Sequence, residues 1–482
     1  MDFLILLFGI VAAIWCAIAF AFWRAKRFPV SFLLGGVAVV ISGSVLGYDF
    51  FNVPGPLPLT IDRAIWGALW GAFVISVFHG RMTLQIWDRM DLLILALLAI
   101  LTLSTGLHDF GYKGNLPISR LLFLYVMPIG MYFLVKHATI TNRDLTIMSV
   151  IFSLFGIYLG VTGLCENRGW YGLIFPSYIH SSEFTEFLGR ARGPFLNPVS
   201  NGLYLVACLG ITWSFYVVAK ARGRMLILAG IPVMLAGAFF TLTRSVWMAT
   251  LLCGGFMIWM PSQLRQRGLM IATGGLVALI FLSSLGQSLL SFKRDKDVTA
   301  AQMSKSASLR PIFARIAVKM FNDRPVWGVG FGQYARYRGF YAKTAQVPSA
   351  AMLELEHARS YFQHNVFLSY LTETGLVGMG WLVLVLMNMT LISLELWKNR
   401  LMSPFARQMG LVMIVVVISY TINGMFHDVS LIVMANMLLF FTAGVASNLH
   451  RQGRILKLNT ALGIYNPSTG QVEAGERLVR AA

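Results

Sequence analysis

Long apolar runs recur along most of this chain, and they limit its possible folds more than any other feature of the sequence. Runs of about 20 residues can each cross the roughly 30 Å hydrocarbon core of a bilayer. Inside lipid such a run must be helical, because no water is present to bond its backbone groups. Hydrophobic residues make up 57% of the chain and charged residues only 12%, about half the charged share of a soluble protein. The sequence therefore predicts an all-α integral membrane protein.

We expect about 13 membrane spans, so that the fold class is a polytopic helical bundle. The first apolar run lacks a basic start, and its positive residues follow it, so it reads as an uncleaved span and not as a signal peptide. The expected spans cover residues 3–23, 30–47, 64–79, 91–107, 120–136, 144–164, 197–219, 225–242, 245–260, 269–290, 365–394, 408–423 and 429–447.

Basic residues in the short connections predict how the chain is oriented, because lysine and arginine gather on the cytoplasmic side. Alternate connections carry most of them: Arg24, Lys26, Arg27, Arg81, Arg89, Lys136, Arg143, Lys220, Arg222, Arg224, Arg265, Arg267, Lys398, Arg400, Arg407, Arg451, Arg454 and Lys457. We expect this side to be cytoplasmic, with the N-terminus outside and the C-terminus inside.

The span pattern divides the chain into five parts. They are N-terminal helices in 1–164, central helices in 165–290 with an outer loop at 165–196, a large outer loop at 291–364, C-terminal helices in 365–447 and a cytoplasmic tail in 448–482. The large loop has more basic than acidic residues. Such a surface is typical either of a solvated loop near anionic lipid headgroups or of a site for an anionic substrate such as a diphosphate.

Arg244 is the first candidate for a functional residue. It lies between two apolar runs, at the predicted outer end of both, within Thr241-Leu-Thr-Arg-Ser-Val-Trp247. A charge so close to lipid is costly unless it is paired or faces a wet cavity, which favours function. The alternative is a snorkelling arginine that binds lipid phosphate.

Arg315 and Lys319 are the next candidates, because they lie four residues apart and so share one face of a helix. An apolar stripe recurs at the same spacing at Ile312, Ile316 and Met320. We expect an amphipathic helix on the outer membrane surface, with Pro311 in its first turn and its end at the Asn-Asp-Arg-Pro of 322–325. A surface helix with solvated basic residues is the alternative.

His364 stands where the large outer loop meets the next span. A histidine can accept a proton near neutral pH, which suits a general base for a hydroxyl nucleophile, although an interfacial histidine is often structural. Glu373 lies nine residues further on, inside the apolar run, about half a helical turn out of phase. We expect Glu373 to pair with an arginine or to orient the helix.

Other patterns indicate less. Arg190 and Arg192 lie at a sharp entry into a span, and either could bind substrate. The glycines of 328–332 are read as a turn that precedes no clear helix start, and the acids of 295–297 as a solvated turn. The scattered cysteines and histidines indicate no metal site. Despite the net charge of +19, the dispersed basic residues argue against nucleic-acid binding.

Several short motifs together resemble the bacterial O-antigen ligase and polymerase family. They are Arg192-Gly-Pro-Phe-Leu-Asn-Pro198, Thr243-Arg-Ser-Val-Trp247, Asn322-Asp-Arg-Pro-Val-Trp-Gly-Val-Gly330, His364-Asn-Val-Phe-Leu368 and Glu373-Thr-Gly-Leu-Val-Gly378. Each motif is short, but their order, spacing and sidedness are fairly specific. The likeness covers about residues 150–445.

The resemblance implies a membrane glycosyltransferase of GT-C type in the bacterial inner membrane, with about a dozen spans and a large periplasmic loop. Such a protein would pass a glycan from undecaprenyl diphosphate to a hydroxyl of a glycan or lipid A-core acceptor, among membrane lipids, without a metal or other cofactor. By motif, the resemblance implies catalytic roles for Arg244, Arg315 and His364. The residues expected to bind substrate are Arg192, Lys319, Asn365 and Glu373.

The chemistry of the residues agrees with this expectation. Fixed guanidiniums can stabilise a diphosphate leaving group in a partly dry site, and the planar fork of arginine binds phosphate in a bidentate manner. The competing hypothesis is a transporter, either a lipid-linked glycan flippase or a permease for small solutes such as bicarbonate. A transporter places its ionisable residues near mid-membrane in repeated halves, whereas the notable charges here gather at one outer face.

Overall fold

A computed structural model gives the fold of the chain. It describes residues 28–47, 50–53, 58–85, 87–111, 116–181, 187–218, 221–260, 300–344, 363–466 and 471–472. Within these ranges the protein is helical apart from its connections and one small hairpin, which confirms the predicted all-α class. The expected spans 3–23 and 269–290 lie outside the described residues.

The remaining eleven expected spans are all present as helices. They are α2 (Phe28–Val45), α3 (Ile61–Phe78), α4 (Arg89–Leu107), α5 (Pro117–Leu121) continued by the π-helical η1 (Leu122–Val126) and α6 (Met127–Lys136), α7 (Asn142–Arg168), α8 (Pro198–Val218), α9 (Ala221–Phe240), α10 (Arg244–Trp259), α16 (Val366–Lys398), α17 (Pro404–Phe426) and α18 (Val433–Ala461). Eight spans within the described ranges are long and apolar enough to cross a membrane.

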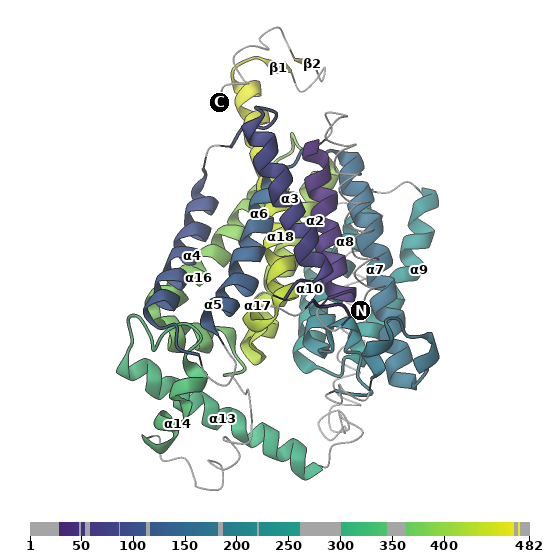
Figure 1. Ribbon diagram of the computed structural model, residues 1–482. Coiled ribbons are helices and arrows are strands. Elements are labelled where there is room, and N and C mark those ends of the chain that lie inside the picture. Colours follow the sequence, from purple (N-terminus) through teal and green to yellow (C-terminus); the bar gives the residue numbers. More distant parts are fainter. Residues whose placement is uncertain are drawn as a thin grey trace.

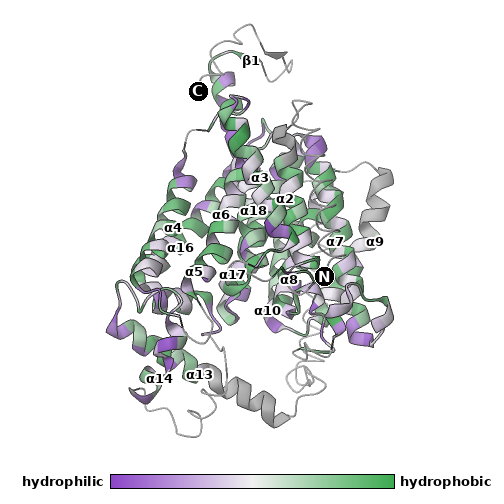
Figure 2. Cartoon of the chain, viewed as in Figure 1, coloured by the Kyte–Doolittle hydropathy of each residue, from purple (hydrophilic) through white to green (hydrophobic). Residues whose placement is uncertain are grey.

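The helix α18 forms the centre of the bundle. Of its most apolar stretch 89% is buried inside the protein, against 22% for α3. It packs against α6, α16 and α17, while α7, α8 and α9 form the side furthest from α4 (Figure 1). Hydrophobic residues cover most of the helix lengths, and hydrophilic ones gather mainly at the two ends of the bundle (Figure 2). This distribution is that of a bundle surrounded by lipid.

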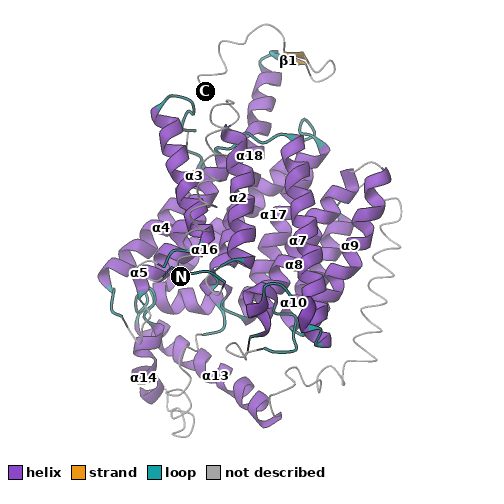
Figure 3. Cartoon of the chain, turned by 45° about the vertical axis from the view of Figure 1, so that its right-hand side comes forward, coloured by secondary structure: helices purple, strands orange, loops and turns teal. Residues whose placement is uncertain are grey.

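The two ends of the bundle differ. The loop end, defined here by the starts of α8, α10, α16 and α18, carries the helices α13 (Ala300–Asp323) and α14 (Tyr334–Thr344) beneath the bundle (Figures 1 and 3). The opposite tail end carries the end of α18. Successive helices alternate in direction along the bundle. The sequence predicts that the connections rich in lysine and arginine are cytoplasmic, and those of them that the structure describes all lie at the tail end.

The helix α18 is longer than the sequence predicted. We expected a span to end at residue 447 and a tail to follow, but α18 continues to Ala461, and a hairpin of β1 (Tyr465–Asn466) and β2 (Gln471–Val472) comes after it. Arginine and lysine end an apolar run, but they are good helix formers, so the helix does not stop where the hydropathy falls. Residues 473–482 lie outside the described ranges.

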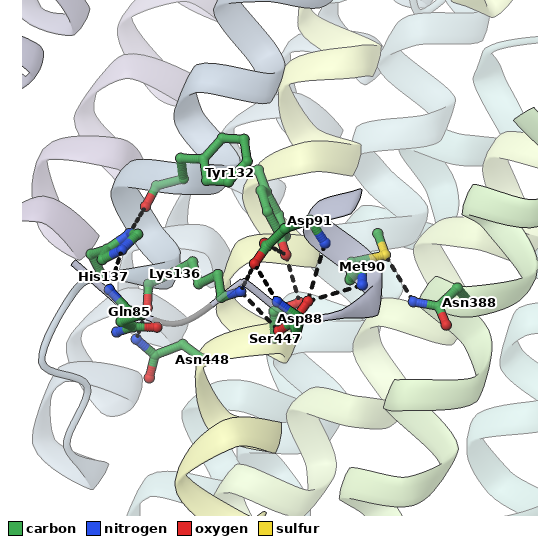
Figure 4. Close-up of polar contacts among 11 residues, drawn as sticks. Gln85, Asp88, Met90, Asp91, Tyr132, Lys136, His137, Asn388, Ser447 and Asn448 are labelled. Atoms are coloured by element: carbon green, nitrogen blue, oxygen red, sulfur yellow. Dashed lines mark hydrogen bonds and ion pairs between the residues drawn. The ribbon is translucent and has the colours of Figure 1, made fainter. Parts of the chain in front are cut away.

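A buried polar network ties three helices together at the tail end (Figure 4). The Lys136 ammonium, only 1% exposed, contacts the Asp88 carboxylate at 2.8 Å and the Asp91 carboxylate. The Tyr132 hydroxyl donates to Asp91 at 2.8 Å, and the Asn448 amide of α18 donates to the Lys136 carbonyl at 2.7 Å. Paired charges of this kind hold α4, α6 and α18 in one register, because separating them would leave a charge buried alone.

The helix α13 buries its apolar stripe against protein and not against lipid. Ile316 and Met320 are fully buried in a small second core with residues of α14, such as Tyr334. We expected the apolar face of α13 to lie on the membrane surface, and this is wrong, because α14 of the same loop covers that face. The helix ends at Asp323 as predicted, but it begins at Ala300, so that Pro311 lies inside it and not in its first turn.

Candidate functional site

The last turn of α17 connects the starts of two helices that carry predicted site residues. The Ser245 hydroxyl on α10 contacts Asn423 Oδ1 at 2.9 Å. The Asn365 amide before α16 donates to the Met425 carbonyl at 2.8 Å. Arg244 and His364 precede Ser245 and Asn365 directly, so the fold brings these two candidates to neighbouring places at the loop end.

Arg244 is the first residue of α10, and its side chain is exposed. The turn before it is held by Arg190, which is 3% exposed and donates to the Thr241 carbonyl at 3.0 Å and to the Thr243 hydroxyl at 2.6 Å. Leu242 in this turn has a φ of 49°, an uncommon conformation for a residue other than glycine. Arg190 therefore positions the turn that presents Arg244.

His364 also has a left-handed backbone, with a φ of 54°. Residues held in such conformations cluster at functional sites, because the surrounding structure must maintain the strain. Its half-buried ring lies 6.1 Å from the ring of Phe313 on α13, centroid to centroid. Asn365 follows as the N-cap of α16, and its side chain accepts a hydrogen bond from the Leu368 amide at 2.9 Å. The predicted substrate contact of Asn365 stays a prediction beside this capping role.

Arg315 lies on α13, at the loop end of the bundle. It lies two residues after Phe313, which packs against His364, and its own side chain is exposed. Lys319 is also exposed, as the predicted shared face requires, and forms an ion pair with Asp323 at 3.8 Å. The fold thus places Arg244, Arg315 and His364 at the loop end. Arg315 is about 200° around α13 from Phe313, so it lies on the opposite face of the helix from the one that packs on His364.

A break in α16 fixes the large outer loop to the bundle. At Gly375 the backbone leaves the helix, with a φ of 64° and a ψ of −161°. The opened backbone bonds the segment that follows α13. The four bonds are Val329 N to Thr372 O (2.9 Å), Gly330 N to Glu373 O (3.0 Å), Leu376 N to Pro325 O (2.8 Å) and Val377 N to Val326 O (3.2 Å). This docking sets the position of α13, and hence of Arg315, relative to α16.

Glu373 anchors the glycine-rich segment 328–332. Its carboxylate accepts hydrogen bonds from Gly332 N at 2.9 Å and Tyr334 N at 3.3 Å and lies 3.7 Å from Arg120. The expected pairing of Glu373 with an arginine is confirmed. The glycine segment is a turn as predicted, but α14 begins directly after it, contrary to our expectation. Since Glu373 is buried and bonded internally, its role in substrate binding stays a prediction.

Arg192 is buried and paired inside the protein. Its guanidinium is 1% exposed and lies 3.6 Å from the Glu166 carboxylate, which also accepts a bond from Gly193 N at 2.8 Å. The pair closes the loop 187–193 onto the end of α7. A direct contact between Arg192 and substrate stays a prediction. In the structure Arg192 holds its loop against Glu166 of α7.

Sequence reasoning did not single out Arg120 and Asp428. Arg120 and Glu373 line a small cavity of about 10 Å³ together with Tyr125, Tyr370 and Ser430. Asp428, in the turn between α17 and α18, accepts a hydrogen bond from Ser430 at 2.5 Å, and burial raises the pKa of its carboxyl to about 6. A lone acid between two apolar runs was the signal that could have marked Asp428.

Comparison with known families agrees with this geometry. Residues 229–383 match the model of the O-antigen ligase family, and the matched stretch contains Arg244, Arg315 and His364. No curated protein sequence matches the chain significantly. The family match, together with helices that are long and apolar enough to cross a membrane, supports a relationship of the chain to the O-antigen ligase and polymerase family.

Proposed function

We propose that this protein transfers a glycan from undecaprenyl diphosphate to an acceptor hydroxyl at the loop end of the bundle. The observation that carries the proposal is that the starts of α10 and α16 meet at the last turn of α17 and that α13 packs against His364, directly before α16. These elements bring Arg244, Arg315 and His364 to one end of the molecule, and all three residues fall within the family match.

The proposed reaction is a single displacement at the anomeric carbon of the donor sugar. The acceptor oxygen forms a bond to that carbon, while the bond between the carbon and the diphosphate oxygen breaks. The diphosphate leaves with the electron pair and stays on its lipid. The proton of the acceptor hydroxyl passes to the imidazole of His364. Such a displacement inverts the anomeric centre, and the reaction uses neither a nucleotide sugar nor a metal.

The arginines would stabilise the charge that develops on the departing diphosphate. Arg244 and Arg315 are exposed at the loop end, and the planar guanidinium of arginine can bind phosphate oxygens in a bidentate manner. Removing one such donor in a site of this kind lowers the rate by about 10²–10³. A general base contributes about 10²–10⁴.

The proposal also assigns the sides of the membrane. The basic connections at the tail end favour a cytoplasmic location for that end, with the N-terminus and the loop end outside. A lipid-linked glycan on the outer face would then reach the site without crossing the bilayer. Labelling of single cysteines placed in residues 334–344 by a membrane-impermeant reagent tests this assignment in intact spheroplasts.

Single alanine substitutions of Arg244, Arg315 and His364 test the mechanism. Each variant is purified in nanodiscs, and glycan transfer from the lipid carrier is measured after the variant is shown to be monodisperse. Matched controls are Arg168→Ala, Lys343→Ala and His180→Ala, which remove exposed residues of the same type or charge outside the proposed site. We expect losses of at least about 10² in rate for the first set only. Wild-type rates in all three site variants would refute the mechanism.

A further inference from the structure

A second cavity, of about 310 Å³, opens at the loop end. Its walls come from the end of α2, the starts of α3, α8 and α18, and the loop before α8. All of these elements lie outside residues 229–383, so the family match assigns the cavity no role. Ligand sites in proteins enclose roughly 300–1,000 Å³, which places this cavity at the lower end and suits a single small ring.

The cavity adjoins the candidate catalytic region. Leu431 lines both this cavity and the small one beside Arg120 and Glu373. The loop before α8 that forms one wall also carries Arg190, which positions the turn before Arg244. A ligand in this cavity would therefore occupy the same end of the molecule as the proposed reaction.

A buried carboxylate supplies one polar wall. Asp62 lines the cavity and is only 4% exposed. The Thr60 hydroxyl, which also lines the cavity, donates to Asp62 Oδ1 at 2.6 Å. A carboxylate offers about four lone-pair sites, so it can accept further hydrogen bonds from a ligand. Burying such a group is costly unless donors compensate it, and sugar hydroxyls are suitable donors.

The hydroxyl of Ser200 supplies the second polar wall. Ser200 lines the cavity and is 1% exposed, and its hydroxyl oxygen has no hydrogen-bond partner among the described residues. Its backbone amide is fixed by the side chain of Asn197 at 3.3 Å. Because buried polar groups in proteins are nearly always paired, this hydroxyl, enclosed in the cavity wall, is a group with which a polar ligand or a water molecule in the cavity could pair.

Aromatic rings complete the lining. Tyr178 and Phe195 both border the cavity, and the Tyr178 hydroxyl donates to the Pro194 carbonyl at 2.8 Å. That bond ties up the phenol proton and leaves the ring as apolar surface. A pyranose has hydroxyls around its rim and C–H groups on its faces, so it needs this combination of a few polar groups and flat apolar surface.

The charges of the lining favour a neutral ring. Arg63 borders the cavity, but its guanidinium lies 3.6 Å over the ring of Phe123 and donates to the Pro58 carbonyl. The Arg63 guanidinium also acts electrostatically on the Asp62 carboxyl, so the lining holds one positive and one negative side chain and has no net charge. A negatively charged sugar would meet that carboxylate at close range in a low-dielectric site.

We propose that the cavity lined by Asp62 and Ser200 is a subsite for one neutral sugar ring of the glycan that the enzyme transfers. This proposal rests on the proposed function. The ring donates hydroxyl protons to Asp62, exchanges a hydrogen bond with Ser200 and packs its C–H groups on Tyr178. The sugar belongs either to the donor or to the acceptor, and kinetics distinguish the two.

Saturation-transfer NMR on the full chain in nanodiscs tests the binding directly. The probes are methyl glycosides of glucose, galactose, mannose and N-acetylglucosamine, with methyl glucuronide as the anionic comparison. We expect saturation transfer to at least one neutral glycoside and weaker transfer to the glucuronide. Absence of transfer to every neutral glycoside, or preference for the glucuronide, overturns the proposal.

Two variants locate the site. Asp62→Asn keeps the shape of the side chain and removes its charge, and Ser200→Leu fills the cavity. Each should weaken glycoside binding by about tenfold to a hundredfold, as expected when a hydrogen bond to a charged or buried group is lost. Thr250→Leu, in an apolar cavity of about 270 Å³ elsewhere in the bundle, is the matched control and should leave binding unchanged. Wild-type binding in both Asp62→Asn and Ser200→Leu contradicts the assignment.

Transfer kinetics separate this proposal from the proposed function. In Asp62→Asn we expect a raised KM for one substrate, donor or acceptor, with kcat changed less, and that substrate carries the bound ring. Arg244→Ala should lose transfer but keep glycoside binding. If Arg244→Ala, Arg315→Ala and His364→Ala keep full transfer while Asp62→Asn loses binding, the catalytic assignment fails and the sugar subsite stands. If Asp62→Asn leaves both KM values unchanged, the subsite plays no part in the reaction and the proposal is refuted.

Discussion

Replacing Gly375 with alanine should release the large outer loop from the bundle. Gly375 holds a φ of 64° and a ψ of −161°, a conformation that side-chain-bearing residues rarely adopt. An added Cβ would lie 2.3 Å from the Val326 carbonyl oxygen and 2.7 Å from the Pro325 carbonyl oxygen. Those two oxygens accept the bonds from Val377 and Leu376, so the substitution acts on the contacts that dock the loop.

The magnitude follows from the same contacts. The backbone strain costs about 1–3 kcal/mol. Losing the two hydrogen bonds costs about 0.5–1.5 kcal/mol each. The state in which the loop is bonded to α16 should therefore be destabilised by about 2–6 kcal/mol. Its population relative to the state with the loop released should fall by about 30-fold to more than 10⁴-fold. The transmembrane bundle should stay folded, because the change acts on the docked loop and leaves the packing around α18 intact.

Hydrogen exchange measured by mass spectrometry on the nanodisc-embedded protein is the assay. Peptides that cover residues 325–333 should lose protection in Gly375→Ala, and glycan transfer should fall because Arg315 is no longer held near α16. The matched control is Gly380→Ala on the same helix, where an added Cβ meets no atom within 4 Å. Equal protection of 325–333 in Gly375→Ala, Gly380→Ala and the wild type would refute the reasoning.

Two further predictions concern buried charges. Lys136→Met should lower the free energy of unfolding by about 3–5 kcal/mol, since it leaves Asp91 without its buried partner. Chemical denaturation in detergent measures this loss. It should be absent from Lys398→Met, where the lysine is exposed, and smaller in the double variant Lys136→Met/Asp91→Asn. If Lys136→Met loses no more stability than Lys398→Met, the pairing is contradicted. Asp428 has a pKa raised by burial from 3.8 to about 6, so the folded state binds the proton more tightly than the unfolded state. The stability contributed by the protonated Asp428 is present below pH 4 and lost between about pH 4 and 6. The difference in thermal midpoint between Asp428→Asn and the wild type should therefore grow over that pH interval and level off above it, and a constant difference from pH 4 to 8 would argue against the raised pKa.

The sequence by itself determined which segments cross the membrane and on which side most basic residues lie. Hydropathy is a local property, and a run of apolar residues in lipid can only be helical, so eleven predicted spans reappear as helices in the described part of the chain. The motifs around Arg244, Arg315 and His364 also pointed to the family that the comparison supports. The ends of helices were less predictable, as α18 shows, because charged residues end an apolar run without ending a helix.

Only the tertiary structure decided how the loop end is assembled. The sequence indicated that Glu373 would meet an arginine, but not that this arginine is Arg120, about 250 residues earlier in the chain. It gave no sign that α16 opens at Gly375 to bond the segment after α13, or that the apolar stripe of α13 faces α14. Hydrogen-bond partners and buried faces depend on which distant segments approach one another, and that is set by packing across the whole bundle and not by any local pattern.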